Sequence, residues 1–148
     1  MHRRQFILRM FQVVLGWMLG AMGLSSEAAA RDRTTFELGF PRDYPPGTVK
    51  HLIFYDAFLI SDSEGIYAIS SVCTHRGGPL FKTDKNDAFV CRRHHARFDL
   101  TGNVVRGPAY SPLPWLKLEL DQEGHILLLR KYKGERGKKI AHKNPKSE

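Results

Sequence analysis

The sequence predicts an all-β fold, and three observations support this prediction. After residue 30, short runs of β-branched and aromatic residues recur at the spacing of strands. The apolar residues in this part show no helical period, and turn-forming Gly, Pro, Asn and Asp separate the runs. A length of 148 residues suits one domain, and an apolar share of 42% is enough for a core. We therefore expect an all-β sandwich or barrel.

The expected strands follow one another along the chain. Residues 34–38 alternate between apolar and polar side chains, and residues 40–47 form a turn region with three prolines and a glycine. Residues 49–60 are rich in Val, Ile, Phe and Tyr and form one bent strand or two. Later strands are expected at residues 66–70, 88–90, 96–99, 115–120 and 126–129. The last two flank the polar residues 121–125 as a hairpin.

The two ends of the chain are basic, whereas its middle is nearly neutral. The whole chain has 23 Lys and Arg against 15 Asp and Glu, but residues 31–130 have 13 basic and 12 acidic side chains. A nucleic-acid-binding domain would concentrate positive charge on the fold itself, so we expect no nucleic-acid partner. Residues 131–148, rich in Lys and Gly, are expected to form a basic, disordered tail.

The first 30 residues have the features of an export signal. Arg3 and Arg4 precede the sequence QFIL and resemble a twin-arginine signal. The uncharged residues 10–26 predict one hydrophobic helix, close to the lower limit of about 17 residues for spanning a bilayer. Three alanines at residues 28–30 offer a cleavage site. Residues 1–30 are thus a signal or a transmembrane anchor, and we favour the anchor.

The two cysteines of the chain are the strongest chemical signal. Cys73 is followed by His75, and Cys91 by His94, in the pattern C-x-H and C-x-x-H. Two thiolates and two imidazoles can hold one tetrahedral zinc ion. They can also hold a two-iron cluster in which one iron takes both cysteines and the other takes both histidines. Both cysteines would then be ligands, so we expect no disulfide.

The surrounding residues resemble the two cluster loops of a Rieske iron–sulfur protein. The sequences CTHRGGPL and CRRHHARFDLTGNVVRGPA carry this resemblance. It continues upstream through PPGTV and YAISSVCTH and downstream through GPAYSPLPWLKLEL. It covers residues 33–130. The resemblance implies a Rieske-type antiparallel β-sandwich or barrel in residues 31–130, with a small cluster-binding subdomain at residues 73–114.

The resemblance also implies the ligands of one [2Fe-2S] cluster. Cys73 and Cys91 would bind one iron as thiolates, and His75 and His94 would bind the other as neutral imidazoles. The neighbouring His95 departs from the family pattern, in which a glycine usually follows the second histidine. The other histidines, His2, His51, His125 and His142, lack a partner cysteine and are expected at the surface.

Three further groups of residues are expected to shape this site. Gly77, Gly78 and Pro79 would shape the first loop, and the glycines would let the backbone approach the sulfur atoms. Residues 107–114 resemble the proline loop that covers the cluster from a third side. Quinol-oxidising members usually have a second cysteine pair that bridges the two loops, and Gly78 and Arg93 occupy those places here.

Two positions near the second loop bear on the redox potential. High-potential members of the family have a serine two residues after the second ligand histidine and a tyrosine two residues further on. Here these positions hold Ala96 and Phe98, which cannot donate a side-chain hydrogen bond. We therefore expect a potential in the lower part of the family range.

The resemblance implies a one-electron carrier. We expect the iron–sulfur subunit of a membrane quinol-oxidising complex of the cytochrome bc type, and thus part of a quinol:cytochrome c oxidoreductase. Its partners would be b-type and c-type cytochromes and a quinol, on the periplasmic side of a bacterial inner membrane after export in the folded state. Three alternatives stay open: the small subunit of an exported molybdenum oxidase similar to arsenite oxidase, a ferredoxin of a ring-hydroxylating oxygenase, and a structural zinc domain.

Overall fold

The computed structural model describes residues 34–142 of the chain. These residues form ten strands and two short 3-10 helices, and all pairs of neighbouring strands are antiparallel. The all-β fold expected from the sequence is therefore confirmed. The expected export signal and hydrophobic helix lie outside the described residues. Within residues 34–142, no helix is long and apolar enough to cross a membrane.

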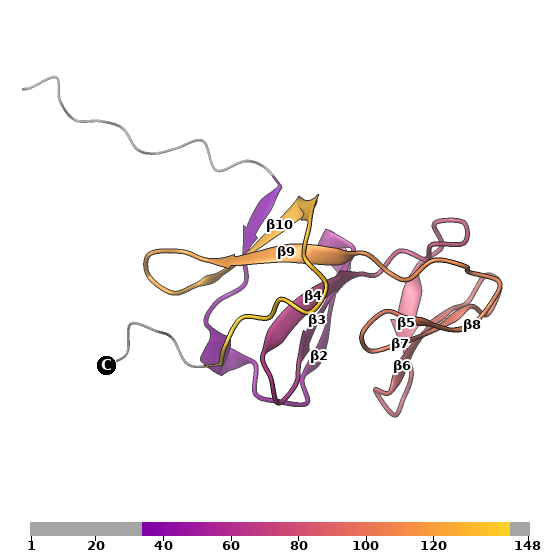
Figure 1. Ribbon diagram of the computed structural model, residues 1–148, viewed down its shortest axis with the longest axis horizontal. Coiled ribbons are helices and arrows are strands. Elements are labelled where there is room, and N and C mark those ends of the chain that lie inside the picture. The colour runs from indigo at the N-terminus through magenta and orange to yellow at the C-terminus, as the bar shows by residue number, and fades with distance from the viewer. Residues whose placement is uncertain (1–33, 143–148) are drawn as a thin grey trace, which may run out of the picture. The chain divides into compact units, whose positions relative to one another are not determined.

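The larger sheet has six strands in the order β1-β10-β9-β4-β3-β2 (Figure 1). Its strands are β1 (Thr35–Glu37), β2 (Val49–Leu52), β3 (Ala57–Ser61), β4 (Ile66–Ser70), β9 (Trp115–Leu120) and β10 (Ile126–Lys133). The segment expected as one or two strands at residues 49–60 thus forms two. They are separated by the 3-10 helix Ile53–Tyr55 and by Asp56, which has a left-handed backbone conformation.

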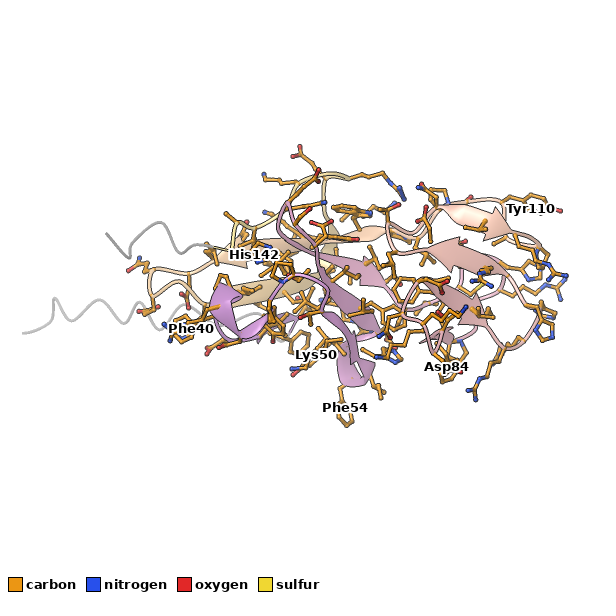
Figure 2. The ribbon with its side chains drawn as sticks, turned by 90° about the horizontal axis from the view of Figure 1, so that it is seen from below. Phe40, Lys50, Phe54, Asp84, Tyr110 and His142 are labelled. Atoms are coloured by element: carbon orange, nitrogen blue, oxygen red, sulfur yellow. The ribbon has the colours of Figure 1, made fainter. Side chains whose placement is uncertain are left out.

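The smaller sheet is inserted between β4 and β9 and has the order β5-β6-β7-β8. Its strands are β5 (Leu80–Lys82), β6 (Ala88–Cys91), β7 (Arg97–Asp99) and β8 (Val104–Arg106). Two of them, β5 and β8, were not expected from the sequence. In Figure 2, Tyr110 lies at the end of the folded domain that the smaller sheet forms, and Phe40 lies toward the opposite end.

Strands β3 and β4 are buried on both faces, and their side chains alternate between two cores. Phe58 and Ile69 face the core that contacts the smaller sheet, whereas Leu59 and Ala68 face the interior of the larger sheet. The Phe58 ring stacks on Phe89 of β6, with ring centroids 4.2 Å apart. This stacking joins the two sheets through aromatic contact.

A second set of contacts anchors the smaller sheet near β9. The rings of Tyr67 and Trp115 stack with centroids 4.5 Å apart. Trp115 donates a hydrogen bond of 2.9 Å from Nε1 to the Thr101 carbonyl oxygen, and the Tyr67 hydroxyl donates to the Leu100 carbonyl at 3.2 Å. Both acceptors lie in the connection from β7 to β8. Side chains of the larger sheet thus anchor this turn of the smaller sheet.

The larger sheet curls until its two edge regions meet. Phe36 of β1 stacks on Tyr55, which follows β2, with ring centroids 4.2 Å apart. Arg130 of β10 forms an ion pair with Asp56 on the same side. The curl encloses a second core, whose fully buried members include Leu59, Ile66, Ile126 and Leu128.

The chain after residue 130 differs from the expected disordered tail as far as residue 142. Strand β10 continues to Lys133, and the Gly134 N–H donates to the Trp115 carbonyl oxygen at 2.9 Å. Ile140 then pairs with Ile66 and packs on the core inside the larger sheet. The apolar side chain of Ile140 thus anchors this basic segment to the start of β4. Residues 143–148 lie outside the described part.

The β4–β5 and β6–β7 connections repeat one backbone arrangement. In the first, the Cys73 N–H donates to the Gly78 carbonyl and the Gly77 N–H donates to the Cys73 carbonyl, at 2.8 and 2.9 Å. In the second, the same two bonds join Cys91 to Ala96 and to His95, at 2.9 and 2.8 Å. Each cysteine therefore begins a loop of the same size, which closes between its residue and the fifth residue after it.

Each loop needs a left-handed residue at its fourth position after the cysteine. That residue is Gly77 in the first loop, with φ of 65°, and His95 in the second, with φ of 58°. A left-handed conformation costs a residue with a side chain about 1–2 kcal/mol. The glycine that usually follows the second ligand histidine in the family would adopt this conformation without strain. His95 adopts it at an energetic cost.

We predict that His95→Gly stabilises the protein. Glycine removes the left-handed strain but adds freedom to the unfolded chain, so the net gain is about 1 kcal/mol or less. The thermal midpoint should rise by about 2–4 °C, measured by circular dichroism. His95→Val is the matched control, and it should lower the midpoint because a β-branched side chain tolerates this conformation worst. An unchanged midpoint in both variants would contradict the strain.

Candidate metal centre

The two cysteines lie at the buried base of the site. Cys73 is 3% exposed and Cys91 is 2% exposed, and both belong to the core between the two sheets. Burial and the neighbouring Cys91 thiol raise the pKa of the Cys73 thiol, whereas the N–H groups of His75 and Arg76, which point at its sulfur, act against them. These N–H groups can stabilise negative charge on sulfur once a metal cation has displaced the proton.

The two histidines expected as ligands lie beside each other at the outer side of the loops. The rings of His75 and His94 have centroids 4.8 Å apart and meet edge to face at 83°. Burial, His94 and Arg76 together lower the pKa of His75, which favours the neutral form that binds metals. His94 is exposed, whereas His75 is partly buried.

One atom of this pair lacks a partner in a place where polar atoms normally have one. Among the residues that the structure describes, His75 Nδ1 is the only buried side-chain nitrogen or oxygen without a hydrogen bond. A buried, neutral ring nitrogen with no partner is a suitable metal ligand. Together with the two buried sulfur atoms, it makes the donor set of the site fit an iron–sulfur cluster.

Gly78 supplies room next to the second sulfur atom. A Cβ atom at this position would lie 2.9 Å from Cys91 Sγ and 2.9 Å from Arg93 Cδ. The absence of a side chain thus allows the first loop to approach Cys91. The side chain of Arg93 fills the space beside Gly78. These two residues occupy the places of the second cysteine pair that the family resemblance implies for quinol-oxidising members.

The connection between β8 and β9 forms a third loop at the site. The Thr74 hydroxyl donates a hydrogen bond of 2.6 Å to the Ser111 carbonyl oxygen, which ties this loop to the first ligand loop. Ala109 and Leu113 are buried in the same core as the two cysteines. Tyr110, between them, is 94% exposed. The proline-rich residues thus lie against the site, as their resemblance implies.

The residues expected to tune the site lie directly under it. Ala96 and Phe98 are both fully buried and share the core of Cys73 and Cys91. Neither residue offers a hydroxyl group. The sulfur side of the site is therefore lined by apolar side chains at these two positions.

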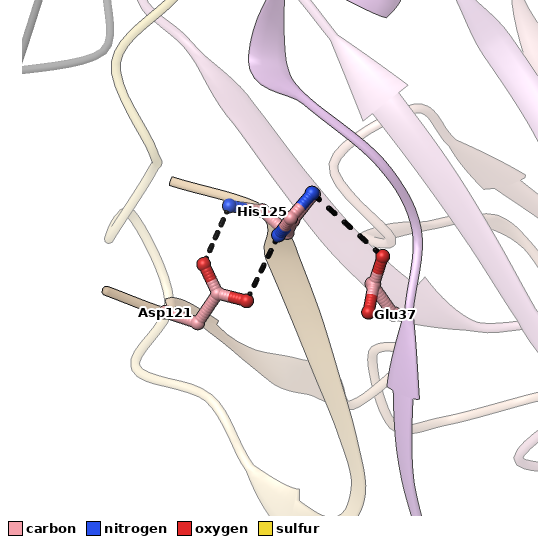
Figure 3. A group of neighbouring side chains, drawn as sticks. All are labelled: Glu37, Asp121 and His125. Carbon is pink, nitrogen blue, oxygen red and sulfur yellow. Dashed lines mark hydrogen bonds and ion pairs between the residues drawn. The ribbon is translucent and has the colours of Figure 1, made fainter. Parts of the chain in front are cut away.

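A second group of possible metal ligands lies at the other end of the described chain (Figure 3). His125 places Nδ1 3.0 Å from Asp121 and Nε2 3.8 Å from Glu37. Partial burial would raise the pKa of Asp121, but hydrogen bonds from the His125 backbone and ring lower it. Because one imidazole lies between the two carboxylates, the group joins the β9–β10 turn to β1. His125, expected as a surface residue, is thus part of a structural contact that only the fold brings together.

Comparisons with known proteins agree with this geometry. The model of the Rieske [2Fe-2S] domain family matches residues 34–132. The cytochrome b6-f complex iron-sulfur subunit of Synechococcus sp. (strain CC9605) is 33% identical, with 74% of each chain covered. That of Chlorobaculum thiosulfatiphilum is 30% identical over 64% of this chain and 52% of its own length. The chain thus spans about half the length of the second relative.

A solved structure shows the same fold. The complex of reduced oxygenase and oxidized ferredoxin in carbazole 1,9a-dioxygenase contains a chain that matches with a TM-score of 0.50 and 22% identity. The match covers 70% of this chain and all of that chain. From the family match, the relatives and the fold together, we conclude that the chain belongs to the Rieske [2Fe-2S] domain family and is a [2Fe-2S] electron carrier.

Proposed function

We propose that this chain is the iron–sulfur subunit of a membrane quinol-oxidising complex of the cytochrome bc or b6-f type. The observation that carries the proposal is the similarity to cytochrome b6-f subunits over 74% of the chain. The partners would be a b-type cytochrome, a c-type cytochrome and a quinol. When bound, the cluster takes up and releases one electron at a time.

Under this proposal, four residues hold the cluster. Cys73 and Cys91 supply the sulfur ligands from the buried base, and His75 and His94 supply nitrogen ligands from the outer side. The unpartnered Nδ1 of His75 supports its role. The exposed His94 ring can offer its other nitrogen to a hydrogen-bonding partner such as a quinol oxygen.

A ferredoxin of a ring-hydroxylating oxygenase is the second candidate. The fold match to the ferredoxin–oxygenase complex and the glycine and arginine at positions 78 and 93 favour it. The twin-arginine sequence favours the first candidate, or the small subunit of an exported molybdenum oxidase, because oxygenase systems draw electrons from cytoplasmic NADH. A neighbouring gene for a cytochrome b, an oxygenase or a molybdopterin enzyme would distinguish the three.

We also propose that the protein works on the periplasmic side of a bacterial inner membrane. The cluster would be inserted in the cytoplasm, where thiols stay reduced, and the folded domain would then be exported. The uncharged residues 10–26 would serve as the retained anchor.

The first prediction of this proposal concerns the ligands. Cys73→Ser, Cys91→Ser and His94→Ala should each abolish the visible absorption of the cluster, because the cluster needs all four protein ligands. Iron content should fall from about two atoms per chain to near zero. His95→Ala is the matched control, with the same change at the neighbouring position, and it should keep the cluster. Full iron content in His94→Ala with loss in His95→Ala would reverse the ligand assignment.

The second prediction concerns the redox potential. Rieske centres span about −150 to +300 mV, and without hydroxyl donors at Ala96 and Phe98 the midpoint should lie below about +100 mV. A donor that stabilises the reduced state by about 1 kcal/mol raises a one-electron midpoint by about 40 mV. Ala96→Ser and Phe98→Tyr should therefore each raise it, and the double variant should raise it most.

Electron paramagnetic resonance during a redox titration measures these midpoints. Val104→Thr is the control, because it adds a hydroxyl to a partly buried side chain packed on the same core without replacing Ala96 or Phe98. Its midpoint should equal that of the wild type. A wild-type midpoint near +300 mV, the upper end of the range, would show that other groups set the potential.

The third prediction concerns export. Replacing both Arg3 and Arg4 with lysine should trap the protein in the cytoplasm, because the twin-arginine receptor reads the arginines and not only their charge. Cell fractionation and immunoblotting measure the distribution. Arg9→Lys is the control, since it makes the same exchange outside the motif and should be exported normally. Unchanged export of the double variant would contradict the signal.

A further inference from the structure

The end of the smaller sheet that bears the ligand loops is strongly basic. Residues 71–79, 91–96 and 106–114, which form the three loops, contain four arginines and no Asp or Glu. These four residues, here called the arginine rim, are Arg76, Arg92, Arg93 and Arg106, and all are exposed. Because the domain as a whole is nearly neutral, this concentration of positive charge is local.

Strand register shows where the balancing negative charge lies. Leu80 pairs with Cys91 at the ligand end of the sheet, whereas Ala88 pairs with Asp99 at the opposite end. The acidic residues of this subdomain, Asp84, Asp87 and Asp99, all lie at or beyond that opposite end. Asp87 is 3.6 Å from Arg97, so the nearest carboxylate is already engaged with an arginine outside the rim.

Two of the four rim arginines make contacts that anchor their side chains without neutralising their charge. The Arg92 guanidinium lies 4.3 Å from the centroid of the Phe81 ring, and the Arg93 stem lies against Gly78. Such anchoring reduces the side-chain entropy that a binding partner would otherwise have to overcome.

No carboxylate inside the described chain uses this charge. Within residues 34–142, none of the four rim arginines forms an ion pair. The rim adjoins two exposed groups that can take part in a protein contact, the His94 ring and Tyr110, which Figure 2 shows at this end. Arginine and tyrosine are the residue types enriched at the centres of protein interfaces.

We propose that the arginine rim is a docking surface for an acidic redox protein, whose carboxylates face the four arginines around the exposed imidazole. The proposal rests on the electron-carrier function and adds the charge of the partner. A partner protein can bring its own redox centre close to His94, whereas an anionic membrane surface pressed against the rim would cover the route by which electrons leave. We therefore assign the rim to a protein partner.

The charge should act on the rate of encounter more than on the final affinity. Exposed charges attract over about one Debye length, roughly 10 Å at 0.1 M salt. Association with an acidic partner should thus be fast at low ionic strength and slow steeply as salt is added. A basic partner should show the opposite salt dependence.

The experiment uses the full cluster-containing chain and one cytochrome in two charge forms. Native cytochrome c is basic, and the same cytochrome becomes acidic when its lysines are succinylated. One electron passes from the reduced chain to the ferric haem, which becomes ferrous, and stopped-flow absorption follows the rate. At an ionic strength of about 0.01 M, the succinylated form should be reduced about tenfold faster, and the difference should vanish near 0.5 M.

Charge-removing variants locate the effect. Arg76→Gln with Arg93→Gln should slow reduction of the succinylated form about fivefold to tenfold. Arg42→Gln with Lys131→Gln is the matched control, with the same net charge but with both changes in the part of the chain formed by the larger sheet. It should change the rate less than about twofold. Sedimentation of the oxidised chain with succinylated cytochrome c should show the same pattern for association alone.

Three outcomes would overturn the proposal. Equal or faster reduction of native cytochrome c would exclude an acidic partner. Equal losses in the rim and control variants would show an effect of net charge only. Rim-dependent binding to phosphatidylglycerol vesicles, without a preference between the cytochromes, would assign the rim to a membrane surface. Absence of the cluster spectrum would instead contradict the electron-carrier function. The sedimentation measurement separates the two cases, because it reports binding of the acidic cytochrome without electron transfer.

Discussion

The structure depends on the burial of two cysteines between two sheets of different size. Cys73 and Cys91 share one core with Phe58 of the larger sheet and Phe89 of the smaller sheet. That core holds the base of both ligand loops. The same loop backbone, with the same two hydrogen bonds, then projects from each cysteine. The two sulfur atoms lie at the buried base of the site, and the rings of His75 and His94 meet on its outer side.

Burial and exposure divide the chemistry of the site. The side facing the core is apolar, since Ala96, Phe98 and Leu113 line it without offering a hydroxyl. The side facing solvent carries the His94 ring and the arginines that surround it. The buried apolar residues would mainly set the redox potential of a cluster held at this site. The exposed residues would mainly select its redox partner. The two properties can then change independently in sequence.

Much of the fold could be predicted from sequence because its strands are long enough to alternate. Strands β4 and β9 have the expected bounds, whereas β5 and β8, which flank the ligand loops, were not expected. The return of Ile140 to Ile66 joins residues 74 positions apart and leaves no local pattern. The ligand spacing was visible, but the left-handed backbone of His95 and the orphaned Nδ1 of His75 arise only from the closed loop.

The loops must be held together without a covalent bridge, and this has an energetic consequence. The Thr74–Ser111 hydrogen bond contributes about 1 kcal/mol, and the Arg92–Phe81 contact about 0.5–1 kcal/mol. A loop-bridging disulfide would contribute about 2–4 kcal/mol. Since each loop offers one cysteine and one histidine, a cluster bound to all four residues would be the strongest link between them. Order at this end of the protein should therefore be coupled to metal binding.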